Sequence, residues 1–182
     1  MTELRGPRVL LRGWRGDDLD PFAALNADVQ VTEFLAGPRT REASAQMIAR
    51  LQADIDARGW GLWAVDLGGR CIGFTGITRP RFEAPFTPCV EVGWRLARHA
   101  WGQGYATEAA GLALAHGFVA LGLPEIVAFT AVGNERSRRV MDRLGMRHRA
   151  ADDFDHPGLP GHPLQRHVLY RLSRDEYLAQ RR

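Results

Sequence analysis

The chain has 182 residues, of which 45% are hydrophobic and 25% are charged, a composition typical of globular proteins. This length predicts one domain over residues 1–182 and excludes a collagen-like or disulfide-scaffold protein. All 24 basic residues are Arg, and the absence of Lys excludes Schiff-base chemistry and a P-loop lysine. The formal net charge of +3 is small for a nucleic-acid-binding protein, and no basic stripe with interleaved aromatic residues supports RNA binding. We therefore predict no nucleic-acid partner.

The cysteines and the N-terminal residues predict a cytoplasmic location. Cys71 and Cys89 fit no CxxC pattern, and residues 1–5 lack the apolar segment of a secretory signal, so both cysteines are predicted to be reduced thiols. The longest apolar stretch, residues 109–123, is interrupted by His116 and is shorter than the roughly 20 residues of a membrane span. We predict no membrane association.

Hydrophobic periodicity and turn residues predict the elements of the N-terminal half. In chain order these are a strand at 9–14, a helix from Asp17 and Asp18 to about Asn26, a helix capped by Thr40 and ended by Gly59, and strands at 62–67 and 71–78. Gly68 and Gly69 predict a tight hairpin turn between the last two strands. Residues 79–88 contain three prolines and are predicted to form a loop.

The C-terminal half continues the alternation of strands and helices. The predicted elements are a strand at 90–96, a glycine-rich turn, a helix to about Leu121, a strand at 126–132, a helix from Asn134 to Leu144 stopped by Gly145, a loop at 152–163 and a strand at 166–172. The helix that ends near Leu121 is apolar nearly all round, including Val119, and is expected to be buried. The order βααβββαβαβ indicates a mixed α/β fold.

The glycine-rich turn is the sharpest local motif. Gly102 and Gly104 lie between a strand and a helix, where the backbone can approach a ligand closely. The amides of the first helical turn then face an anion, and a pyrophosphate suits them best. A plain turn that starts a helix remains the alternative. A dinucleotide fingerprint fits poorly, because Thr107 stands where a third glycine should lie and no acidic residue ends the next strand.

Three segments together resemble the GNAT acyltransferase superfamily. They are Glu91-Val92-Gly93-Trp94-Arg95-Leu96, the run from Trp101 to Ala109, and Asn134-x-x-Ser137-x-x-Val140-Met141-x-x-Leu144-Gly145-Met146. The resemblance is closest to the RimJ/RimL-like branch, in which Trp is common at the position of Trp101. It implies a mixed sheet splayed at its fourth strand, with flanking helices and acetyl-CoA in the split. It also implies transfer of an acetyl group to a primary amine, either a protein N-terminus or a small molecule, without a metal. A homodimer is left open.

The resemblance assigns contacts with acetyl-CoA residue by residue. The backbone amides from Gly102 to Thr107 correspond to the pyrophosphate site, the main chain of Trp94 and Leu96 to the site of the acetyl carbonyl and pantetheine, and Asn134 to a pantetheine contact. Arg138 or Arg139 reaches toward the 3′-phosphate, where an Arg fork pairs well with phosphate oxygens. The expected contact set is Trp94, Leu96, Trp101, Gly102, Gln103, Gly104, Tyr105, Ala106, Thr107, Asn134, Ser137 and Arg139.

Glu91 and Ser137 are the candidate catalytic residues. Glu91 corresponds to a Glu often found in this branch, where a carboxylate takes a proton from the incoming ammonium; a strand Glu paired with a neighbouring Arg is the alternative. Many members place a proton-donating Tyr where this chain has Met141, which cannot donate a proton. Ser137 lies on the same helical face and can replace it, or it is a buried hydroxyl bonded to the helix backbone. Asn134 is equally consistent with a plain N-cap.

A polar cluster near the C-terminus suggests two further alternatives. Its members are Asp153, Asp155, His156, His162 and His167. Their spacing matches no tight zinc motif, so we predict no metal and expect this segment to line the acceptor pocket. The two cysteines lie in no motif for a covalent acyl-enzyme, which favours direct transfer. Transfer of a longer acyl group and a non-catalytic acyl-CoA-binding regulatory module are the rival functions.

Overall fold

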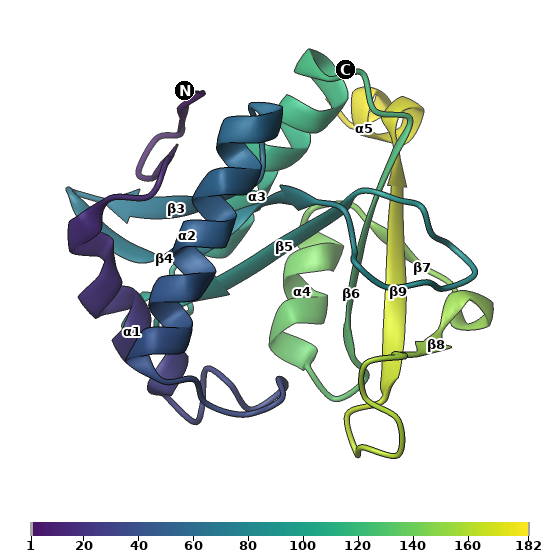
Figure 1. Cartoon of the computed structure of the whole chain (residues 1–182). Coiled ribbons are helices and arrows are strands. Elements are labelled where there is room, and N and C mark those ends of the chain that lie inside the picture. Colours follow the sequence, from purple (N-terminus) through teal and green to yellow (C-terminus); the bar gives the residue numbers. More distant parts are fainter. Residues whose placement is uncertain (1, 182) are drawn as a thin grey trace.

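A mixed β-sheet with helices on both faces forms the framework of the computed structural model, which describes residues 2–181 (Figure 1). The strands are β1 Leu4–Arg5, β2 Leu10–Arg12, β3 Leu62–Leu67, β4 Arg70–Thr78, β5 Glu91–Leu96, β6 Glu125–Ala131, β7 Arg147–His148, β8 Phe154–Asp155 and β9 Arg166–Ser173. Their order in the sheet is β1-β2-β3-β4-β5-β6-β9-β7, and β8 pairs with β9.

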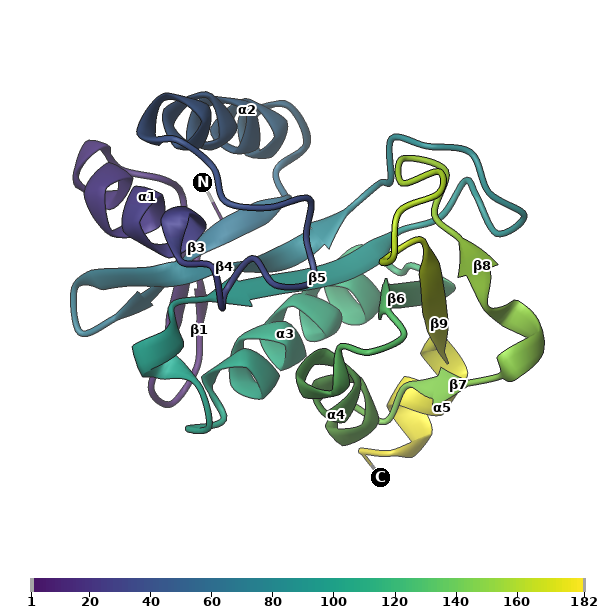
Figure 2. The ribbon, with the colours of Figure 1, turned by 90° about the horizontal axis from the view of Figure 1, so that it is seen from below.

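Five α-helices cover the sheet. They are α1 Leu19–Ala27, α2 Arg41–Arg58, α3 Tyr105–Ala115, α4 Glu135–Arg143 and α5 Arg174–Ala179. Figure 2 shows α1 and α2 above the sheet and α3, α4 and α5 below it. A π-helical turn, His116–Ala120, extends α3 to the predicted end of that helix. Trp63 and Ile77 of the central strands, Ile55 of α2 and Leu114 of α3 are all buried in the core that these layers enclose.

The predicted helix ends and hairpin turn are confirmed. The Thr40 hydroxyl accepts a hydrogen bond from the Ala43 amide at the start of α2, and Gly59 ends the helix with φ at 78°. Gly68 and Gly69 both have positive φ in the β3–β4 turn. All four residues perform the roles that their local chemistry predicts.

Only one residue pair joins β5 and β6, which are parallel. Glu91 pairs with Val127, and the Val127 amide donates to the Val90 carbonyl at 2.9 Å. Beyond this bridge the two strands separate, while β5 remains paired with β4 along its full length. The sheet is therefore split at β5. This strand is the fourth of the predicted strands; it is numbered fifth here because the short β1, which was not predicted, precedes the others.

Four elements differ from the prediction. β1, β7 and β8 have two residues each, too short to show a strand periodicity, and β8 lies within the predicted loop at 152–163. We also did not predict α5, although Ser173 and Glu176 form a capping box at its start. Val119 was expected on a buried helix but is 66% exposed, because the buried stripe of this helix runs through Ala110, Leu114 and Phe118 and Val119 lies beside it.

Two further observations concern the whole described chain. Cys71 and Cys89 are free cysteines, as predicted. No helix within residues 2–181 is long and apolar enough to cross a membrane.

Candidate active site

The split between β5 and β6 opens into a cleft of about 440 Å³. Its walls come from β5, β6, the glycine-rich turn, α4 and the segment 28–40 that joins α1 to α2. In Figure 2 this joining segment runs from α1 to α2 and crosses β5 in the view. The predicted site residues that line the cleft are Glu91, Trp94, Leu96, Trp101, Gly102, Gly104, Tyr105, Ala106, Thr107, Asn134, Ser137 and Arg139.

Glu91 lies at the point where the split begins. It belongs to the single residue pair that joins β5 and β6, and its side chain is largely removed from solvent. Burial raises the pKa of the Glu91 carboxyl to about 8. Within residues 2–181 no Arg or His forms an ion pair with it, so the alternative of a strand Glu paired with a neighbouring Arg does not describe this structure. A carboxyl with a raised pKa in a cleft has the properties of a general base or acid.

The glycine-rich turn leads directly into α3. Gly102 and Gly104 have φ values of 74° and 80°, which side-chain-bearing residues rarely adopt. Gly104 is the N-cap of α3 and supplies no side-chain cap, so the amides of the first turn are available to an anion. The Thr107 hydroxyl is buried there without a hydrogen-bond partner within the described chain. These features fit a pyrophosphate.

Arginine side chains surround this turn. Arg8 donates from Nη1 to the Gln103 carbonyl at 2.8 Å and pairs with Glu108 of α3 at 2.7 Å. Gln103 does not line the main cleft but a shallower hollow beside it, together with Arg8 and Arg143. Arg136 lies over the Trp101 ring, 4.6 Å from its centroid. Arg136 also pairs with Glu33 at 2.7 Å, so Arg136 and Arg8 are both already matched by a carboxylate. Their remaining N–H groups can still donate to the phosphates of a coenzyme A.

The start of α4 places Asn134 and Ser137 on the cleft wall. The Asn134 side chain caps the helix, because its Oδ1 accepts from the Ser137 amide at 3.2 Å and its Nδ2 donates to the Thr130 hydroxyl at 2.9 Å. Ser137 is half-buried, and Met141 is 1% exposed. The N-cap role of Asn134 is thus confirmed, and its contact with pantetheine stays a prediction.

The structure separates the two arginines that the sequence left as alternatives. Arg138 donates from Nη1 to the Val132 carbonyl at 3.2 Å and does not line the cleft. Arg139 does line it and pairs with Glu135 at 2.9 Å across one helical turn. Arg139 is therefore the better placed of the two for a phosphate.

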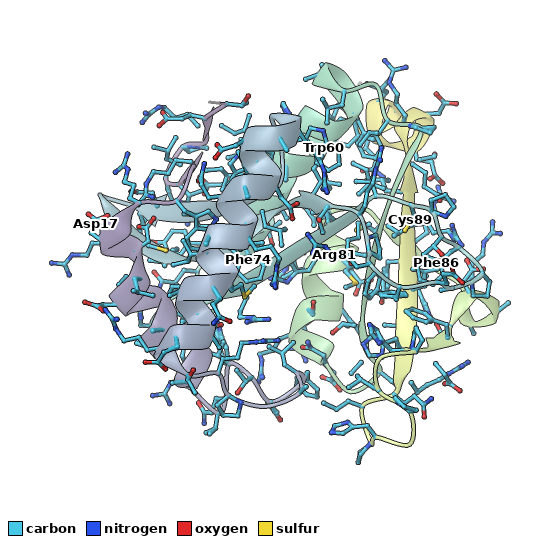
Figure 3. All side chains as sticks on the ribbon, viewed as in Figure 1. Asp17, Trp60, Phe74, Arg81, Phe86 and Cys89 are labelled. Atoms are coloured by element: carbon cyan, nitrogen blue, oxygen red, sulfur yellow. The ribbon has the colours of Figure 1, made fainter. Side chains whose placement is uncertain are left out.

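The C-terminal polar cluster does not line the cleft, so that expectation is wrong. His156 and His167 join a cluster of aromatic rings instead, 5.0 Å apart between centroids, and Asp153 pairs with His148 at 2.7 Å. The cluster, formed by Phe82, Phe86, Phe129, Phe154, His156 and His167, packs the proline-containing loop and β8 against β6 and β9. Figure 3 shows Phe86 and Cys89 in this C-terminal half of the molecule. No group of three potential metal ligands occurs within residues 2–181.

Several cleft residues escaped the sequence analysis. Three apolar residues of segment 28–40 line the cleft, namely Val31, Phe34 and Leu35, and only the tertiary fold brings them there. Phe129 and Thr130 contribute from β6. Arg95, in contrast, could have been found from the sequence. Side chains alternate along a strand, so Arg95 lies on the same face of the strand as Glu91.

Comparisons with known proteins agree with this geometry. The family model described as "Acetyltransferase (GNAT) domain" matches residues 8–147. The chain is 30% identical over 163 residues to the FsC-acetyl coenzyme A-N(2)-transacetylase of Aspergillus fumigatus, covering 85% of this chain and 68% of that protein. It is 29% identical over 148 residues to the uncharacterized protein YkkB of Bacillus subtilis, covering 80% and 85%.

A solved structure shares the fold. The acetyltransferase (GNAT family) from Bacillus anthracis superposes with a TM-score of 0.79 at 24% identity, over 96% of this chain and all of that chain. The chain belongs to the GNAT acetyltransferase family, whose members use acetyl-CoA as co-substrate, and it is an acyltransferase.

Proposed function

We propose that this protein transfers an acetyl group from acetyl-CoA to a primary amine by direct transfer, with Glu91 as the general base. The observation that carries the proposal is the position of Glu91, a carboxyl with a raised pKa at the start of the split in the sheet. A base whose pKa lies near neutrality is matched to taking a proton from an ammonium group.

Different residues of the cleft bind acetyl-CoA and move the protons of the reaction. The glycine-rich turn and the arginines at the cleft mouth hold the phosphates, while β5 beyond Glu91 has no sheet partner on its β6 edge, which leaves backbone groups for the acetyl and pantetheine parts. Glu91 accepts a proton from the ammonium, directly or through water. The free amine nitrogen then bonds to the thioester carbonyl carbon, the carbon–sulfur bond breaks, and the nitrogen loses its second proton to solvent as the amide forms. Glu91 returns its own proton to solvent before the next turnover. The departing thiolate takes a proton from solvent or from the Ser137 hydroxyl.

The cysteines support direct transfer without an acyl-enzyme. Burial raises the pKa of both Cys71 and Cys89 to about 11, and the nearby charge of Glu91 adds to the shift at Cys89. At neutral pH both are therefore thiols and not the thiolates that covalent catalysis requires. Free thiols also support a cytoplasmic location, which remains part of this proposal together with membership of the RimJ/RimL-like branch, supported by Trp101.

An acetylation screen tests the proposal. Peptide N-termini, polyamines, aminoglycosides and free amino acids are incubated with acetyl-CoA and either wild type or the Glu91→Gln variant, and release of free coenzyme A is measured. We expect amine-dependent release with wild type, and a loss of roughly 10²-fold or more in the variant, which keeps the shape of the side chain but not the base. A protein that binds acetyl-CoA but consumes none with any amine is a regulatory module and contradicts the proposal.

A further inference from the structure

Two arginines on the cleft wall, Arg95 and Arg143, form no ion pair within residues 2–181, and of these Arg143 is exposed to solvent while Arg95 is not. Arg95 of β5 lines the cleft, and within residues 2–181 no Asp or Glu lies at ion-pair distance from it. Burial lowers the pKa of its guanidinium to about 10, and the positive charge of Arg39 contributes to this shift. Arg95 is still charged at neutral pH. A charge withdrawn from water in this way is costly unless a ligand pairs with it.

Neutral groups hold the Arg95 side chain in place. Its Nη1 donates to Asn26 Oδ1 at 2.7 Å, and its guanidinium lies 5.2 Å from the centroid of the Phe74 ring. Asn26 is fully buried and donates from Nδ2 to the Ser44 hydroxyl at 3.1 Å. Since Asn26 lies near the end of α1 and Ser44 in the first turn of α2, both helices fix the guanidinium. Figure 3 shows Phe74 beneath these helices.

Arg95 and Glu91 face the same side of β5 with an open strip between them. Strand side chains alternate, so Glu91, Gly93 and Arg95 share the face toward α1 and α2. A Cβ at Gly93 would meet no atom within 4 Å, which leaves the strip unfilled. At about 3.3 Å per residue the Cα atoms of Glu91 and Arg95 are about 13 Å apart, so the carboxyl and the guanidinium meet only if both side chains lean toward each other along the strand.

We propose that Arg95 binds a carboxylate of the acceptor, so that the acceptor is a zwitterion with its amine at Glu91 and its carboxylate at Arg95. This inference rests on the proposed function and names the substrate class of the same site. An ammonium group complements Glu91, a carboxylate complements Arg95, and the strip at Gly93 accommodates the atoms between them.

The hydrogen bonding of Arg95 favours a single planar anion. Nη1 already donates to Asn26, while the Nε–Nη2 edge has no partner within residues 2–181. Two parallel N–H groups on one edge match the two oxygens of a carboxylate. The amine and the carboxylate of one acceptor therefore each meet a side chain that otherwise lacks a charged partner.

Matched acceptors test the proposal. We would measure kcat/KM, expressed per free amine, for β-alanine, γ-aminobutyrate and glycylglycine, each compared with its own carboxamide. For the acceptor that wild type acetylates best, kcat/KM is expected to be about tenfold or more higher for the carboxylate form than for its carboxamide, as for a charge-assisted bidentate contact. Arg95→Gln should reduce this ratio to about 1 by lowering the carboxylate values, because the amide side chain carries no charge; Arg95→Lys should retain part of the preference.

Arg98→Gln is the matched control. Arg98 is an exposed arginine three residues along the chain that bonds Gln30 and does not line the cleft, so its variant should keep the wild-type ratio. Equal turnover of acid and amide by wild type, or an unchanged ratio in Arg95→Gln, overturns the carboxylate site while the proposed function stands. An Arg95→Gln effect confined to the KM for acetyl-CoA overturns it as well. No acetylation of any amine contradicts the proposed function and this inference together.

Discussion

At the residue scale, Glu91 is a carboxyl whose ionisation the fold makes unfavourable. Its pKa is raised to about 8 from an ordinary value of 4.5, and the cause is burial at the start of the split without a cationic partner in the described chain. Such an arrangement is unfavourable for stability and favourable for proton transfer, which is typical of functional sites. The cost can be measured without any substrate.

The pH dependence of stability is the first prediction. The folded chain keeps the Glu91 proton up to about pH 8 and the unfolded chain loses it near pH 4.5, so the unfolding free energy falls as pH rises through this window. Glu91→Gln removes this contribution. Relative to wild type, the variant should gain on the order of 2–4 kcal/mol between pH 5 and pH 9, measured by urea unfolding. Glu83→Gln, at an exposed position, should show no such gain, and a pH-independent difference for Glu91→Gln would refute the assigned burial effect.

Ser137 is the second residue whose role can be measured. Its side chain lies on the cleft wall, one helical turn from Met141. We expect Ser137→Ala to raise the KM for acetyl-CoA by an amount equivalent to about 1 kcal/mol, as for one lost hydrogen bond, with kcat nearly unchanged. Steady-state kinetics with acetyl-CoA as the varied substrate decides this. A fall in kcat alone would instead identify the hydroxyl as the general acid, and a change in melting temperature alone would leave it as a packing residue.

At the element scale, the glycine-rich turn and the first turn of α3 act together as an anion site. Gly104 combines a φ of 80° with the N-cap position, and Arg8 fixes the turn from outside through the Gln103 carbonyl. A side chain at Gly104 therefore changes both the backbone and the space that a pyrophosphate needs.

Gly104→Val tests this element. We expect the affinity for acetyl-CoA to fall by about tenfold or more, equivalent to about 1.4 kcal/mol, because the β-branched residue disfavours positive φ and narrows the approach to the amides. Isothermal titration calorimetry measures the change. Gly161→Val is the matched control, since Gly161 has a φ of 71° in a loop away from the cleft. This variant introduces the same backbone strain but does not alter the proposed phosphate site. Equal affinities for the two variants would remove the argument for a phosphate site.

At the scale of the whole molecule, a buried ionic network joins the N-terminal elements. Arg12 of β2 bonds both oxygens of Asp18, at 2.7 and 2.8 Å, and donates from Nε to Asp66 at 2.8 Å. Asp66 also accepts from the Gly69 amide in the β3–β4 turn at 2.7 Å. The network thus links β2, the start of α1 and the central hairpin. The two carboxylates raise the pKa of the Arg12 guanidinium above its ordinary value.

Arg12→Met should destabilise the protein by about 3–5 kcal/mol, because it leaves two buried carboxylates without their cation. Arg41→Met is the control, since the Arg41–Asp20 pair is exposed and such pairs contribute about 0–1 kcal/mol. Chemical denaturation of both variants at neutral pH gives the comparison. Similar losses for the two would show that the buried network does not hold these elements together.

The sequence by itself determined the features that depend on near neighbours along the chain. Thr40 and Asn134 start their helices, Gly59 and Gly145 follow the helices they end, and the alternation of strands and helices identifies the fold, because caps, turns and periodicity act within a few residues. The family motifs likewise placed Glu91 and the glycine-rich turn in one site.

Only the tertiary structure decided which distant residues meet. It brought segment 28–40 to the cleft, left Arg95 without an anionic partner beside an open strip, and packed His156 and His167 into an aromatic cluster instead of the cleft. Burial and pairing of a charge depend on the groups that surround it in space, and these come from distant parts of the chain, as Asn26 does for Arg95 at 69 residues along the sequence. No local pattern contains that information, so the pKa of Glu91 and the pairing of Arg95 followed from packing alone.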